Sequence, residues 1–166
     1  MRLPPTLVVV FAVVGLEFAL SFWLASFLHD DLGLARGTAA AMVGGLYAAN
    51  LVGRLVASRL SRRVDALPLL AASLVLALVG AGTGAMFPLV SSLHLGAASV
   101  GSDGAMGAVL SVAAAGQVLG PLAVGVVAQW SSLRVGLLTL PALVVVALGG
   151  LAVHRVTYAG RGPGSG

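Results

Sequence analysis

Long apolar stretches fill most of this chain, and short polar segments separate them. The stretches cover residues 6–28, 38–58, 67–95, 105–128 and 135–153. A helix rises 1.5 Å per residue, so about 20 apolar residues cross the roughly 30 Å hydrocarbon core of a bilayer. Charged residues are only 8% of the chain, too few to cover a water-facing surface. The pattern predicts an all-α, polytopic transmembrane helix bundle in one domain, residues 1–153, and a disordered Gly-rich tail, residues 154–166.

The third stretch, residues 67–95, has a length that fits neither one span nor two. As a single helix it would be about 43 Å long, more than a straight span needs. Two complete spans and a turn would need at least about 38 residues. Glycines between Gly80 and Gly84, followed by Pro88, favour a kinked or broken helix. The sequence therefore predicts five spans, or six if this stretch folds back, and the two counts place the tail on opposite sides of the membrane.

The segment of residues 50–63 predicts the orientation of the chain. It holds four of the nine basic residues, namely Arg54, Arg59, Arg62 and Arg63. An excess of Arg in a short connection between spans favours the cytoplasmic face. The preceding connection, residues 29–37, is acidic and suits the outer face. We therefore expect a multi-pass protein of the inner (plasma) membrane with Arg59, Arg62 and Arg63 in the cytoplasm.

Composition argues against several other classes of protein. The chain has no Cys, which excludes disulfides, thiolate catalysis and Cys metal sites. His94 and His154 have no ligand partners at metal-binding spacing, so we expect no metal. No catalytic Ser-His-Asp pattern, zinc-protease motif or phosphate loop is present, so we expect neither an enzyme nor a cofactor. The net charge of +4 is explained by orientation, and we do not expect nucleic-acid binding.

Glu17, near the middle of the first span, is the strongest candidate for a functional residue. A carboxylate at mid-membrane costs a few kcal/mol and usually serves a pathway, a proton relay or a cation. Counted from the cytoplasmic ends of their spans, Glu17 and Tyr47 lie about 16 Å deep and Asn50 about 12 Å deep. We therefore expect these three side chains to meet. The open alternative is a protonated, purely structural Glu17 that is hydrogen-bonded to a neighbouring helix.

Tyr47, Asn50 and Arg54 share one face of the second span, at spacing i, i+3 and i+7. Tyr47 and Asn50 are candidate solute or relay contacts, or else interhelical hydrogen bonds that hold the bundle together. Arg54 lies within about 6 Å of the inner boundary. It either anchors the helix by extending to the headgroups or forms a gating ion pair.

Gln117 is a further candidate contact in the pathway. It lies in the span of residues 105–128, between Gly116 and Gly120, and Pro121 follows. Glycines four residues apart on a membrane helix allow another helix to approach closely. The sequence therefore predicts a close helix contact at this level of the fourth stretch, with an amide group beside it.

Four blocks occur in order along the chain: GLEFALSFWLASFL, AANLVGRLVASRLSRR, GAGTGAMFPLVSSLHLGAA and GQVLGPLAVGVVAQW. They resemble helices seven, eight, ten and eleven of a major facilitator superfamily transporter, in the bacterial branch related to sugar permeases and drug exporters. Arg59, Arg62 and Arg63 match the cytoplasmic loop motif G-x-x-x-D-R-x-G-R-R of that family. Ser58 and Ser61 stand where the motif has its acidic residue and second Gly.

The resemblance implies half of a major facilitator fold, which carries a small solute by alternating access. In that reading Glu17 loads a proton or cation, Tyr47, Asn50 and Gln117 contact the solute, and the Arg loop stabilises one access state. A lone half needs a second transporter half, from another chain or by self-association. LPLLAASLVLALVG resembles the start of the ninth helix, yet it runs directly into the tenth block, so roughly twenty residues are absent.

Two alternatives stay open at this stage. The absent residues favour a non-transporting membrane fragment or an interaction subunit. A more distant alternative is a small dimeric multidrug exporter, which also has a Glu in its first helix. Those proteins have four short helices, and nothing after the second span resembles them.

Overall fold

The computed structural model describes residues 4–60, 62–77, 91 and 102–158 of the 166. Their helices are α1 (Pro5–Ser26), η1 (Phe27–Asp31), α2 (Arg36–Leu60), α3 (Ala66–Ala77), α5 (Ser102–Trp130), α6 (Leu133–Gly136) and α7 (Thr139–Tyr158). The π-helix η1 continues α1 directly. The described part of the chain contains no strand. The prediction of an all-α helical bundle is confirmed.

Four helical segments in the described residues are long and apolar enough to cross a membrane. They are Pro5–Asp31, Arg36–Leu60, Gly104–Trp130 and Leu133–Thr157. The spans predicted at residues 6–28, 38–58, 105–128 and 135–153 each fall inside one of these segments. Their length and hydropathy indicate a membrane protein.

The third predicted span is only partly described. α3 has 12 residues, about 18 Å of helix, which is shorter than a membrane span. The remainder of this predicted span, residues 78–90 and 92–95, lies outside the described residues. The prediction of one crossing or two falls on that part of the chain. α7 continues to Tyr158, so the first five residues of the predicted disordered tail, residues 154–158, are helical. Arg155 in its last turn suits the negative end of the helix dipole.

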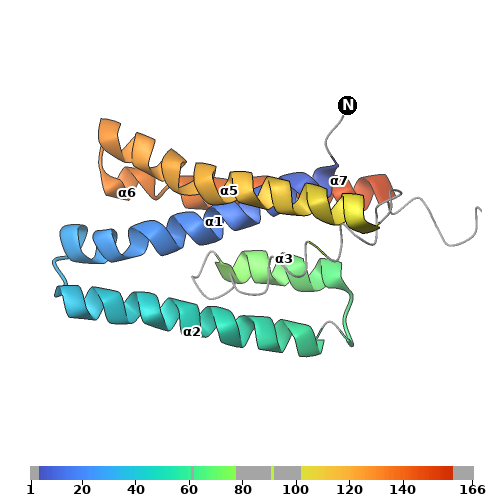
Figure 1. Cartoon of the computed structure of the whole chain (residues 1–166), viewed down its shortest axis with the longest axis horizontal. Helices are drawn as coiled ribbons and strands as arrows, with labels where there is room; N and C mark the ends of the chain where they lie inside the picture. Colours follow the sequence, from blue (N-terminus) through green and yellow to red (C-terminus); the bar gives the residue numbers. More distant parts are fainter. Residues whose placement is uncertain (1–3, 61, 78–90, 92–101, 159–166) are drawn as a thin grey trace, which may run out of the picture.

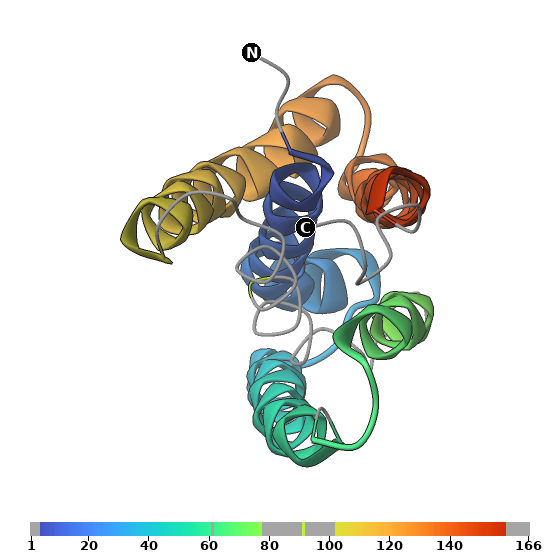
Figure 2. The ribbon, with the colours of Figure 1, turned by 90° about the vertical axis from the view of Figure 1, so that its right-hand side faces the viewer.

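α1 lies at the centre of the bundle. Figure 2 shows α1 between α5 and α2, with α7 beside α1 and α3 next to α7. Glu17 and three hydroxyl residues aside, α1 is apolar on all its faces, which suits a helix with neighbours on several sides. Val9, Val10, Ala12 and Val13 are completely buried. Half of the α1 span is buried, against 11% of the α2 span. α2 is therefore a peripheral helix with most of its surface uncovered.

Glycines bring α1 and α5 into close contact. A side chain at Gly116 would lie 2.7 Å from the carbonyl oxygen of Phe11, and one at Gly120 would overlap the backbone of Gly15. The close helix contact predicted from the GxxxG spacing is thus present, with Gly15 as the partner. Because the residue numbers of the paired positions increase together, α1 and α5 run in the same direction.

The direction of α1 and α5 fixes the ends of the bundle. α7 runs opposite to α1, since Gly150 packs near Pro5 and Val9. The start of α1, the Arg-rich connection from α2 to α3 and the end of α7 therefore lie at one end of the bundle, as Figure 1 shows. The start of α1 and the end of α7 at one end of the bundle are what an even number of membrane crossings between them would produce.

Candidate functional site

The hairpin of α1 and α2 brings polar groups together near the middle of α1. The turn between η1 and α2 contains Gly33 at φ 69°, a backbone conformation that glycine adopts without strain. His29 closes the hairpin, because its Nδ1 is 2.8 Å from the carbonyl oxygen of Leu34 and its Nε2 accepts from Arg36. This turn makes α1 and α2 antiparallel and sets their register. Glu17 then lies about 18 Å from the start of α1 and about 21 Å from the end of η1.

Glu17, Asn50 and Arg54 form one hydrogen-bonded cluster. Asn50 Nδ2 donates to Glu17 Oε1 at 2.7 Å, and Arg54 Nη2 donates to the same oxygen at 3.2 Å. Arg54 Nε donates to Asn50 Oδ1 at 3.2 Å. Asn50 is therefore held by both of its side-chain polar atoms, and the Glu17–Arg54 ion pair joins α1 to α2. Hydrogen bonds that involve a charged partner are about twice as strong as neutral ones.

The two charges of this cluster differ in exposure. The Glu17 side chain is 13% exposed, whereas the Arg54 side chain is 51% exposed. A guanidinium in lipid at this depth costs several kcal/mol, and such residues almost always face a bundle interior or a water-filled cavity. The exposed half of the Arg54 side chain therefore needs water or another polar group as a hydrogen-bond partner. Of the two roles predicted for Arg54, the ion pair has its partner here, because the side chain reaches Glu17.

Tyr47 and Gln117 lie outside the cluster. Tyr47 is 55% exposed on α2 and forms no hydrogen bond with any described residue. The structure therefore brings Glu17 together with Asn50, but it does not bring Tyr47 to them. Gln117 is exposed on α5, and α1 lies between α5 and α2 (Figure 2). No contact among the described residues connects Gln117 with Glu17.

The three arginines of the connection after α2 lie at one end of the bundle. Arg59 is in the last turn of α2, where a positive charge complements the helix dipole. Arg62 and Arg63 are exposed in the turn that follows, and the Arg63 backbone N–H donates to the carbonyl oxygen of Leu60 at 2.9 Å. None of the three forms an ion pair with a described residue. Their side chains are available to lipid phosphates or water.

A second ion pair, which the sequence did not indicate, closes the opposite end. Arg134 Nε donates to Asp31 Oδ1 at 3.2 Å, and its Nη2 donates to the Asp31 carbonyl oxygen at 3.1 Å. The pair ties η1 to α6 across 103 residues of chain. Local spacing gives no signal for such a contact. It depends on α1 and α5 being parallel, which brings the ends of both helices together.

Trp23 also has a role that its sequence position did not reveal. Its indole Nε1 donates to the carbonyl oxygen of Pro121 at 2.9 Å, and its ring packs on Gly125. The residue therefore connects α1 to α5 beyond the glycine contact. Its hydrogen bond lies between helices.

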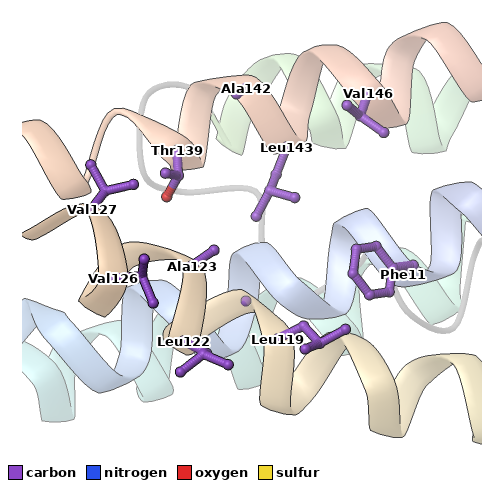
Figure 3. A pocket seen from close by; sticks show the side chains of 11 residues that line it. Phe11, Leu119, Leu122, Ala123, Val126, Val127, Thr139, Ala142, Leu143 and Val146 are labelled. Atoms are coloured by element: carbon purple, nitrogen blue, oxygen red, sulfur yellow. The ribbon is translucent and has the colours of Figure 1, made fainter.

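A groove of about 560 Å³ lies between α1, α5 and α7, and Figure 3 shows its lining. Its walls are Phe11 and aliphatic side chains such as Leu119 and Leu143, and the hydroxyl of Thr139 is its one polar side-chain group. None of the cluster residues lines it. The groove suits acyl chains or another apolar surface, and it offers no group that would recognise a polar solute.

The described part of the chain brings together no group of three or more His, Asp or Glu residues that would hold a metal ion. Comparison of the chain with protein-family models, with curated proteins and with solved structures finds no match. The major facilitator relationship therefore stays a prediction from the sequence blocks.

Proposed function

We propose that the chain is one half of a major-facilitator-like secondary transporter, which moves a small solute across the inner membrane by alternating access and couples it to a proton through Glu17. One observation carries this proposal. Glu17, halfway along the first helix of membrane length, meets Asn50 and a half-exposed Arg54 from the second half of α2. Ionisable groups at such a depth are expensive and mark ion or solute pathways.

The cluster has the chemistry of a two-state switch. When Glu17 is charged, it accepts hydrogen bonds from both Asn50 and Arg54 and fastens α1 to α2. Protonation removes the charge of Glu17 and with it the ion pair, whereas Asn50 keeps a hydrogen bond to the neutral acid. α1 and α2 are therefore held together more strongly when Glu17 is charged than when it is protonated. Such a bistable contact is what alternating access requires.

The charges at the two ends of the bundle support an orientation. One end carries Arg59, Arg62, Arg63 and Arg155 with Asp65. The other end carries Asp30 and Asp31 with Arg36 and Arg134, which balance one another. Positive charge in short connections is retained in the cytoplasm. We therefore place the Arg-rich end, together with the start of α1 and the end of α7, on the cytoplasmic side.

The exposed side of α2 supports the need for a second half. Only 11% of the α2 span is buried, and Arg54 and Tyr47 open onto that uncovered surface. We place the other wall of the solute path there, on a second transporter half supplied by another chain or by self-association. A pathway between two halves is the usual arrangement in transporters built from repeats.

The test compares solute uptake by membrane vesicles of the native cells, so that any partner chain is present. The gene is deleted, then restored as wild type, as Glu17→Gln or as Asp30→Asn. A panel of a neutral sugar, a lipophilic cation and a small organic anion is offered under an imposed pH gradient. We expect one class to accumulate with the wild type and with Asp30→Asn, an exposed carboxylate away from the cluster, but not with Glu17→Gln.

Two outcomes would overturn the proposal. If restoring the wild-type gene changes the uptake of no member of the panel, a non-transporting membrane fragment or an interaction subunit becomes the better assignment. If Glu17→Gln accumulates solute as well as the wild type does, Glu17 is a structural residue. In that case proton coupling through this cluster is wrong.

A further inference from the structure

We infer that the solute is a small organic monoanion, which binds Arg54 and crosses together with one proton carried by Glu17. This inference rests on the proposed transport function and adds the substrate class and the stoichiometry. It follows from the open side of Arg54 and from the charge balance of the cluster.

The Arg54 guanidinium has N–H groups that donate to no described residue. Its Nε and Nη2 are engaged by Asn50 and Glu17, while Nη1 donates to no described residue and half of the side chain is exposed. A guanidinium presents its N–H groups as a planar fork that matches the two oxygens of a carboxylate. The same fork that now holds Glu17 at 3.2 Å can therefore hold a second carboxylate from the exposed side.

Tyr47 supplies a second polar group on the same surface. Tyr47 and Arg54 lie seven residues apart, two turns along α2 and about 20° apart around the helix. Tyr47 is 55% exposed, and its hydroxyl forms no hydrogen bond with a described residue. A phenol donor and a guanidinium on one open face favour an oxygen-rich anion. A cation placed there would be repelled by Arg54.

The charge balance links the anion to a proton. With Glu17 ionised and no solute, the cluster is neutral, because Glu17 and Arg54 cancel. If the anion binds alone, the cluster carries one net negative charge, and if the proton binds alone it carries one net positive charge. When both bind, the neutral Glu17 acid stands beside an Arg54–anion pair, and the cluster is neutral again. A net charge at mid-membrane costs several kcal/mol, so the two neutral states dominate.

No other charge of the described bundle disturbs this balance. Residues 67–73 of α3 and 104–130 of α5 include no ionisable residue, and the described ionisable side chains of α7 are His154 and Arg155 at the end placed in the cytoplasm. On α2, Arg54 and the phenol of Tyr47 are the ionisable groups near this level. The proton is taken up on the Glu17 carboxylate, Arg54 stays protonated throughout, and the solute carboxylate replaces Glu17 as its ion-pair partner. Proton and anion then leave together on the other side.

The experiment uses the native-cell vesicles with a series of short monocarboxylates and their uncharged amides. The membrane potential is clamped with potassium and valinomycin. Coupling of one proton to one monoanion predicts accumulation of about tenfold per unit of imposed pH difference, at any clamped potential. Arg54→Gln should abolish uptake of the acids, whereas Arg134→Gln, at the outer end, should leave it unchanged. Glu17→Gln should still exchange labelled for unlabelled anion but lose accumulation driven by pH.

The possible results distinguish failure of this inference from failure of the proposed transport function. Uptake of a sugar or a cation that depends on Glu17, with no uptake of monocarboxylates, would overturn the inference and leave the transporter standing. Anion uptake that varies with the clamped potential, or that survives Arg54→Gln, would also overturn it. Uptake of no solute of any charge would overturn both proposals.

Discussion

Replacement of Gly120 by Ala tests the packing on which the bundle depends. The added methyl carbon would lie 2.6 Å from Gly15 Cα and closer still to the Gly15 carbonyl oxygen. Carbon atoms that are not bonded prefer about 3.5–4.0 Å. The obstacle is backbone on a neighbouring helix and cannot rotate away. α1 and α5 must therefore separate locally by about 1 Å.

The cost of that separation has two parts. Overpacking of a well-filled contact destabilises by about 1–3 kcal/mol. A gap of 0.5–1 Å along the rest of the seam also forfeits about a quarter to a half of each dispersion contact. We therefore expect Gly120→Ala to lower the unfolding free energy by about 2–3 kcal/mol, near the upper end of the overpacking range. That corresponds to a change of about 30- to 150-fold in the equilibrium constant.

Gly107 provides the matched control on the same helix. A side chain there would meet nothing within 4 Å, and Ala is a better helix former than Gly by up to about 1 kcal/mol. Gly107→Ala should therefore be neutral or slightly stabilising. Unfolding is followed in mixed SDS micelles by the fluorescence of Trp23, in a Trp130→Phe background that leaves one tryptophan. Equal stability of the two Ala variants would refute the close α1–α5 contact.

Three smaller effects follow from the polar contacts, each measured by SDS unfolding with circular dichroism. Trp23→Phe removes the hydrogen bond to α5 and should cost about 0.5–1.5 kcal/mol; no loss would mean that the bond is not made. Asn50→Ala removes a donor to Glu17 and should cost about 0.6–2 kcal/mol, and a stabilised variant would contradict the cluster. Arg134→Gln breaks an exposed pair and should cost less than about 1 kcal/mol. High salt should erase that difference, and a larger loss that persists in salt would show a buried role for the pair.

Span lengths and the glycine contact could be predicted because both depend on local composition. About 20 apolar residues suffice to identify a membrane-length helix, and Gly116 and Gly120 are visible as a spacing of four. The partner of these glycines was not visible. Gly15 is a lone glycine in α1, and only the packing of the bundle shows that it faces α5.

The candidate site shows the limits of counting residues from the membrane boundary. Such counting matched the depths of Glu17 and Tyr47, yet Asn50 is the residue that faces α1. Tyr47 lies about 60° around α2 from Asn50, which turns it to the open surface. Counting also placed Arg54 near the inner boundary. It measured the position of the backbone, whereas the long arginine side chain extends to Glu17.

The central claim is that the polar face of α2 borders water at mid-membrane, and cysteine accessibility tests it most directly. The chain has no native Cys, so Tyr47→Cys and Val52→Cys can each be labelled in native membranes with a charged thiol reagent. The two positions are 55% and 58% exposed, about 8 Å apart along α2, and lie on different faces. We predict labelling at Tyr47→Cys and protection by lipid at Val52→Cys, with both reactive after denaturation. If Tyr47→Cys is as protected as Val52→Cys, no aqueous path reaches Arg54 and the transport account is wrong.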